Sequence, residues 1–195
     1  TLNKTGSLNM EKDTILKFLT YFNIGFIIVI LFELIVIILF STIIELNLGP
    51  YTVNIITMIF TSGFTSLDVI LEWILLLIAI CGFLALNIAL LIFSIKKKKE
   101  DMLLPKFLLL IGMFFLISGF IKMFSIYLLA NSVIQYNSSS IVFQTALYTD
   151  SITPFLGAVM WIYILAVTII ILVSGLVFGG IGLKTMLKME EKSSN

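Results

Sequence analysis

Two charged residues, Glu33 and Lys122, lie deep within long apolar stretches of this 195-residue chain. Glu33 follows Phe18, the start of its stretch, by 15 residues, and Lys122 follows Pro105 by 17. If both stretches are helices that rise from the same side of a bilayer, a rise of about 1.5 Å per residue places both side chains roughly 22–26 Å above the boundary. The equal depth predicts an ion pair between Glu33 and Lys122.

A charge at the bilayer centre costs at least about 2.5–3.5 kcal/mol on insertion scales, so we expect both groups to be paired or hydrated. Both fall in the outer half of the bilayer, within reach of water or of snorkelling. Small polar residues surround Lys122 at helical spacing and suit a neighbouring helix. They are Ser118, Gly119 and Ser125.

Two interpretations of this pair follow. In the first, it fixes helix register or meets a partner subunit. In the second, it is a site for protons, ions or an anionic ligand, as intramembrane charges often are. The chain has no His and no second deep acid to extend a proton relay. We therefore favour the structural interpretation.

The residue types of the chain exclude much other chemistry. There is no His, and all 12 basic residues are Lys, which excludes bis-His haem, His-rich metal sites and nucleophile pairs that use His. The lone Cys81 has no partner for a disulfide or a redox pair. The net charge of +1 leaves no basic stripe for nucleic acid. We expect no catalytic residues, no metal site, no cofactor and no nucleic-acid partner.

The elements that must position these residues are membrane helices. The chain is 60% hydrophobic and 12% charged, with a mean hydropathy of +1.17, which is too apolar for a water-soluble domain. Four stretches are long enough to cross a bilayer, and Pro105 and Pro154 suit helix starts. The sequence predicts an all-α integral membrane protein, a four-transmembrane-helix bundle of one domain without an internal repeat. Its spans are expected at about 18–40, 73–95, 106–130 and 154–183, with tails at 1–17 and 184–195.

Lysine placement predicts the orientation of the bundle. Eleven of the 12 Lys precede the first span, lie between the second and third or at the start of the third, or follow the fourth. By the positive-inside rule, both termini and the middle loop are cytoplasmic. The Lys before the first span favour an uncleaved span over a signal peptide. The loop also offers ammonium groups to anionic lipid headgroups, namely Lys96, Lys97, Lys98 and Lys99.

The two external connections are expected to carry short elements. Residues 51–60 are apolar and too short to span, which favours an interfacial helix or a lid over the bundle. The second connection, 131–153, has a segment apolar enough for a short helix or a hairpin, and Asn137 begins an N-glycosylation pattern. Aromatic residues at the outer boundary resemble an interfacial belt. They are Trp73, Tyr127, Tyr136, Tyr148, Trp161 and Tyr163.

The fourth span carries small residues at spacings of three, four or seven, which allow two helix backbones to approach closely. This packing seam consists of Gly157, Thr168, Gly175, Gly179 and Gly182. The seam serves either packing within this chain's own bundle or contact with another subunit.

These observations favour a non-catalytic integral membrane subunit with a structural, anchoring or accessory role in a larger membrane assembly. Its expected partners are membrane lipids and other membrane-protein subunits or copies of itself. The alternative is a small oligomeric channel or transporter that uses Glu33 and Lys122. Four helices leave little room for a conduit, and no motif singles out a known family.

Overall fold

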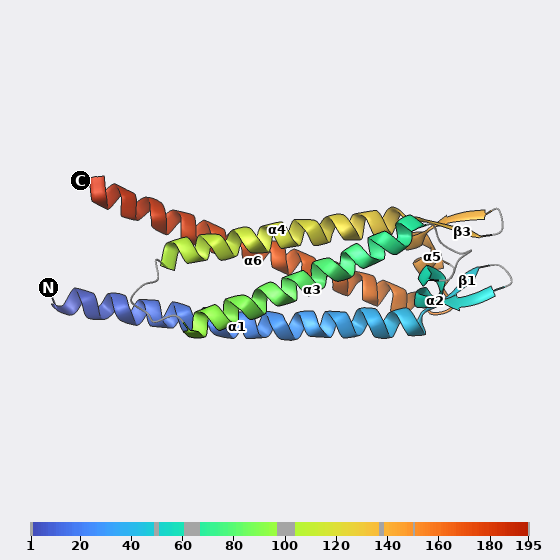
Figure 1. The fold of residues 1–195 in the computed structure, drawn as a ribbon, viewed down its shortest axis with the longest axis horizontal. Coiled ribbons are helices and arrows are strands. Elements are labelled where there is room, and N and C mark those ends of the chain that lie inside the picture. Colours follow the sequence, from blue (N-terminus) through green and yellow to red (C-terminus); the bar gives the residue numbers. More distant parts are fainter. Residues whose placement is uncertain are drawn as a thin grey trace.

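The computed structural model describes residues 2–48, 51–60, 67–96, 104–136, 139–149 and 151–194. Four long helices form a bundle, with both chain termini at one end and two small β-hairpins at the other (Figure 1). We call these the terminal end and the hairpin end. The four long helices are α1 (Leu2–Ile43), α3 (Leu67–Lys96), α4 (Leu104–Asn131) and α6 (Pro154–Ser194).

Each long helix contains a segment that is long and apolar enough to cross a membrane, which confirms the predicted number of spans. These segments are Lys17–Ile43, Val69–Ile95, Leu104–Asn131 and Pro154–Leu187. Pro154 is the first residue of α6 and Pro105 the second of α4, where the missing N–H of proline leaves no intrahelical bond unmade. Helices α1 and α6 extend into the segments that were expected to be tails.

A β-hairpin and a short helix join each pair of long helices at the hairpin end. Strands β1 (Glu45–Leu48) and β2 (Tyr51–Asn54) lead into α2 (Ile55–Phe60). Strands β3 (Val133–Tyr136) and β4 (Ser139–Val142) lead into α5 (Phe143–Thr149). The prediction of helix over residues 51–60 is wrong for its first half, because this segment pairs with the chain just before it as an antiparallel strand. Strand pairing gives hydrogen bonds to backbone N–H and C=O groups that a single helical turn would leave without partners.

The chain is a tandem repeat, which corrects the expectation of no repeat. Helix, strand, strand, short helix and helix follow one another twice in the same order. The amide of Ile55 donates to the carbonyl of Ile44, and 88 residues later the amide of Phe143 donates to the carbonyl of Ser132. Trp73 and Trp161 are the two tryptophans of the chain, and they show the same offset of 88 residues. Parallel repeats of this kind are related by an axis along the bundle.

The short helices close the hairpin end with equivalent residues. In α2, Ile55, Met58 and Ile59 have no exposed surface. In α5, the residues 88 positions later, Phe143, Ala146 and Leu147, have none either. The spacing of three and four residues puts each set on one helix face, so both helices pack a single apolar face against the bundle. A bridge between Leu46 and Ser151, with Ile152 N donating to Glu45 O at 2.9 Å, joins the two repeats there.

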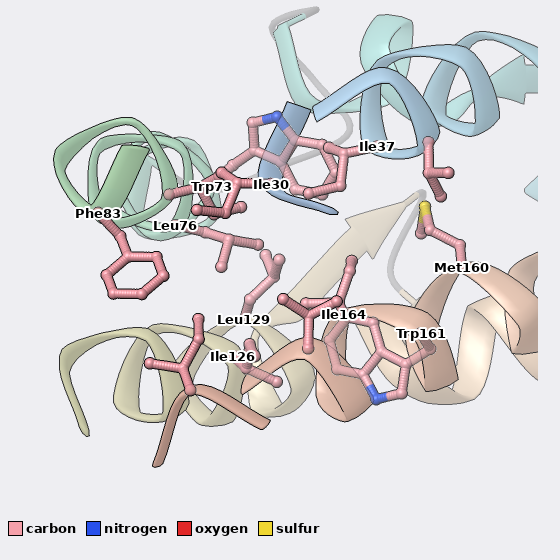
Figure 2. Close-up of a cluster of buried hydrophobic side chains, with 14 of the residues drawn as sticks. Ile30, Ile37, Trp73, Leu76, Phe83, Ile126, Leu129, Met160, Trp161 and Ile164 are labelled. Carbon is pink, nitrogen blue, oxygen red and sulfur yellow. The ribbon is translucent and has the colours of Figure 1, made fainter. Parts of the chain in front are cut away.

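The two tryptophans are buried, which corrects their assignment to an interfacial belt. Each is 3% exposed, and both rings contact Phe143, with centroids 6.4 Å away for Trp73 and 6.3 Å for Trp161. Figure 2 shows both side chains among apolar residues from all four long helices. Of the remaining residues of the proposed belt, Tyr127 and Tyr148 are exposed and Tyr163 is half-buried. The side chain of Tyr136 lies outside the description.

Candidate functional site: a buried ion pair and a glycine seam

Glu33 and Lys122 form the predicted ion pair in the interior of the bundle. The Lys122 ammonium Nζ donates to Glu33 Oε1 at 2.5 Å. Glu33 is 0% exposed and Lys122 is 1% exposed. The expectation that water or snorkelling reaches these groups from the surface is therefore wrong. Because both side chains are removed from water, each charged group is stabilised mainly by its partner in the ion pair.

The repeat explains why these two residues meet. Glu33 lies on α1, the first helix of one repeat, and Lys122 on α4, the first helix of the other. They are 89 residues apart, one more than the repeat offset, so they hold nearly equivalent positions. Equivalent residues that point toward the axis between two parallel repeats face each other at the same depth. The ion pair therefore joins the two repeats across the centre of the bundle.

The residues around the ion pair provide hydrogen-bond partners for only part of the Glu33 carboxylate. Tyr163 of α6 packs its ring on Phe32 with centroids 5.5 Å apart, and its hydroxyl donates to the carbonyl of Val29 at 3.3 Å. Both contacts place Tyr163 beside the turn of α1 that carries Glu33. Within the described residues, the second carboxylate oxygen of Glu33, Oε2, is buried without a hydrogen-bond partner. Glu33 Oε2 is therefore a hydrogen-bond acceptor that the described residues leave unsatisfied.

Five phenylalanines fill the bundle between the ion pair and the terminal end. Phe26 precedes Glu33 by seven residues and Phe115 precedes Lys122 by seven, two helical turns in each case. The two rings lie 5.4 Å apart, and Phe83 of α3 lies 5.1 Å from Phe115. Phe22 and Phe178 extend the cluster edge to face at 4.9 Å. These ring contacts fill the centre of the bundle between the ion pair and the terminal end.

The polar stripe around Lys122 serves helix packing. Ser125 is fully buried, but its hydroxyl donates to the carbonyl of Ile121 on its own helix at 2.9 Å. Ser118 is half-buried. Gly119 is buried, and a Cβ on it would lie 2.6 Å from Leu172 of α6. At Gly119 the stripe thus faces a neighbouring helix, and that helix belongs to the same chain.

Most of the glycine seam packs α6 against α4. A Cβ on Gly175 would lie 2.8 Å from the backbone nitrogen of Leu116, and one on Gly182 would lie 2.5 Å from that of Leu109. Gly179 faces Gly112, where a Cβ would lie only 2.2 Å from the nitrogen of Gly179. These contacts decide between the two interpretations of the seam, because the approach they allow is made within this chain.

Two members of the predicted seam have other neighbours, and one member was missed. Gly157 approaches the carbonyl of Leu147 in α5, and Thr168 is buried with its hydroxyl donating to Ile164 O at 2.8 Å. Gly112 on α4 completes the seam and was not among the predicted residues. Its spacing of seven residues from Gly119, two turns on one helix face, was the available signal.

Comparison of the chain with family models, curated proteins and solved structures finds no match. The chemistry of the site must therefore be read from its own geometry.

Two predicted sites lie outside the described residues. Asn137 of the glycosylation pattern is one, and Lys97, Lys98 and Lys99 of the basic loop are the other. The backbone of Lys96 ends α3, and its side chain is also outside the description. Among the residues that the structure does describe, no three of His, Cys, Asp and Glu gather closely enough to hold a metal ion.

Proposed function

We propose that this chain is a non-catalytic integral membrane subunit that serves as a scaffold in a larger membrane assembly. The observation that supports this role most is the closed interior. Glu33 and Lys122 form an ion pair with each other, and phenylalanines fill the interior between this pair and the terminal end. Such an interior stabilises the bundle and offers little room for a conduit, so we give the channel or transporter alternative second place.

In this proposal, the terminal end faces the cytoplasm. Lys17, Lys106 and Lys184 are exposed in the parts of α1, α4 and α6 near that end. The hairpin end carries Glu45 as an exposed acid. The separation of Lys from the hairpin end supports the orientation through the positive-inside rule.

Cysteine labelling tests this orientation. In a Cys81→Ser background, an impermeant maleimide added to intact cells is expected to label Gln135→Cys in the hairpin β3–β4. Met189→Cys, beyond the apolar segment of α6, is expected to react only after the membrane is opened. Both native side chains are exposed, so reactivity reports the compartment rather than burial. Labelling of both cysteines in intact cells, or of Met189→Cys alone, would contradict the orientation.

The hairpin β3–β4 offers the surface that we assign to a partner subunit. Val133 and Val142 are opposite each other in the register, and they are 41% and 38% exposed. Residues directly opposite on antiparallel strands share one face, so the two side chains form a small apolar patch at the hairpin end. Ile152 is also exposed, and its amide donates to the carbonyl of Glu45 in β1. Apolar surface that protrudes at the end of a bundle is typical of protein contacts.

The partner proposal predicts that Val133→Ser with Val142→Ser releases the chain from its assembly in native membranes. The expected result is a shift from a large complex to the free protein–detergent particle on native electrophoresis, with unchanged thermal stability. Gln135→Ala, an exposed change on the same hairpin, is the matched control and leaves the complex intact.

Two results would reject the scaffold role. The first is a wild-type chain that migrates alone after mild solubilisation. The second is ion flux into liposomes that contain the purified chain and its loss in Glu33→Gln, because that outcome supports the channel or transporter.

A further inference from the structure

Two buried asparagines, Asn23 of α1 and Asn87 of α3, take no part in the ion pair or the glycine seam. Asn23 is 1% exposed and Asn87 is 0% exposed. Asn87 Nδ2 donates to the carbonyl of Phe83 on its own helix at 2.8 Å. Within the described residues, Asn23 Nδ2 and Asn87 Oδ1 have no hydrogen-bond partner. The interior therefore contains one unsatisfied donor and one unsatisfied acceptor, and each costs free energy unless another group pairs with it.

The two asparagines lie at one level of the bundle. The rings of Phe26 and Phe83 meet with centroids 5.9 Å apart. Asn23 precedes Phe26 by three residues and Asn87 follows Phe83 by four, so each Asn shares a helix face with the Phe of its own helix. Helices α1 and α3 run in opposite directions (Figure 1). Both steps therefore lead about 4.5–6 Å from the Phe contact toward the terminal end.

The position of Asn87 on α3 turns it toward α1. Among the long helices, α3 packs mainly against α1 and α4. The side that faces α4 is marked by Phe93, whose ring lies 5.2 Å from that of Phe107. Phe93 is six residues beyond Asn87, which places the two side chains about 120° apart around the helix axis. Because Asn87 is buried and turned away from α4, the helix that covers it is α1, which carries Asn23 at the same level.

The two repeats differ at this level. The positions equivalent to Asn23 and Asn87 in the second repeat are Ile111 and Gly175. Gly175 lets α6 approach α4 so closely that an added Cβ would lie 2.8 Å from the backbone nitrogen of Leu116. An asparagine side chain at the equivalent position keeps α3 further from α1. The first repeat therefore places polar groups between its helices where the second repeat brings two backbones together.

We infer that Asn23 and Asn87 bind one water molecule between α1 and α3. The water oxygen accepts a hydrogen bond from Asn23 Nδ2, and a water O–H donates to Asn87 Oδ1. Buried waters pair polar groups of this kind, and the bridge they form is nearly as favourable in enthalpy as a direct hydrogen bond. This site joins the two long helices of the first repeat, and it depends neither on the orientation of the bundle in the membrane nor on a partner subunit.

Water contacts of the Asn23 side chain test the inference. The purified, isotope-labelled full chain is placed in nanodiscs, and rotating-frame Overhauser spectra separate proximity to water from proton exchange with it. We expect a proximity signal between water and the side-chain amide protons of Asn23, and its loss in Asn87→Leu. Ser94→Ala is the matched control and is expected to retain the signal, because the Ser94 hydroxyl donates to Leu90 O within α3. Absence of the signal in the wild type would overturn the inference, and that measurement needs no variant to fold.

Stability gives a second measurement at the same site. Asn23→Leu and Asn87→Leu each leave the other amide without its water bridge, so each is expected to lower the folding equilibrium constant in bicelles about tenfold. The double variant is expected to lose less than either single variant, because two leucines at this interface need no hydrogen bond. Additive losses in the double variant would contradict a bridge between the two side chains. Retention of the Asn23 water signal in Asn87→Leu would contradict it as well.

Discussion

Lys122→Met alone is expected to lower the free energy of unfolding in a bilayer by about 3–5 kcal/mol. The cause is the Glu33 carboxylate, which keeps its buried place and loses the ammonium group 2.5 Å away. Glu33→Gln is expected to have a loss of similar size, because it leaves the ammonium group unpaired. Reversible unfolding in bicelles measures all of these values.

The double variant Glu33→Gln with Lys122→Met is expected to be more stable than either single variant. Replacing a buried ion pair by groups of similar volume is often neutral, because both desolvation costs disappear with the attraction. Lys106→Met is the matched control, since Lys106 is exposed on the same helix, and its effect is expected to stay within about 0.5 kcal/mol. If the double variant is no more stable than the single ones, the two charges do not stabilise each other as a pair.

Gly112→Ala is expected to destabilise the bundle by about 1–3 kcal/mol or more. The added Cβ would lie 2.2 Å from the backbone nitrogen of Gly179, and backbone on both sides prevents a local adjustment. Helices in lipid associate through close packing rather than through a hydrophobic driving force, so separating α4 from α6 removes much of what holds them together. The same unfolding measurement reports the loss.

Gly180→Ala provides the control for the glycine seam. Gly180 is next to Gly179 on α6, and a Cβ on it would have nothing within 4 Å. Alanine in a helix is favoured over glycine by about 0.5–1 kcal/mol, so this variant is expected to be as stable as the wild type or more stable. Equal destabilisation by Gly112→Ala and Gly180→Ala would show that the close contact at Gly112 does not limit the approach of the helices.

The meeting of Glu33 and Lys122 at one level of the bundle could be predicted from the sequence, whereas the burial of the pair could not. Counting residues from Phe18 and Pro105 places both charges at one level. Their exposure depends on which helices surround them, and α6, which brings Tyr163 beside Glu33, is distant from α1 in the chain. The burial of Trp73 and Trp161 has the same origin, because Phe143 of α5 lies against both rings.

The repeat was hidden for a related reason. Buried positions accept different apolar residues as long as neighbouring residues keep the total volume, so Ile55 can correspond to Phe143, and Met58 to Ala146, without visible sequence similarity. The glycines of the close α4–α6 contact have no glycine counterparts in the first repeat, where Gly25 and Gly82 have no neighbouring atom within 4 Å of an added Cβ. The positions equivalent to Gly112 and Gly179 are Ile24 and Leu91. This difference accounts for the closer packing of α4 with α6 and masks the repeat further.

By itself, the sequence determined the four apolar helices, their alternation in direction and the separation of Lys from one end of the bundle. The length of each apolar stretch and the placement of Lys are local properties of the chain, and they determine insertion into a bilayer and orientation in it. Only the tertiary structure decided which helices are neighbours, that the seam is closed within the chain, and that Glu33 meets Lys122 at the axis between two repeats. Helix contacts in lipid depend on shape and on the orientation of each face, and these properties arise only when all four helices are in place.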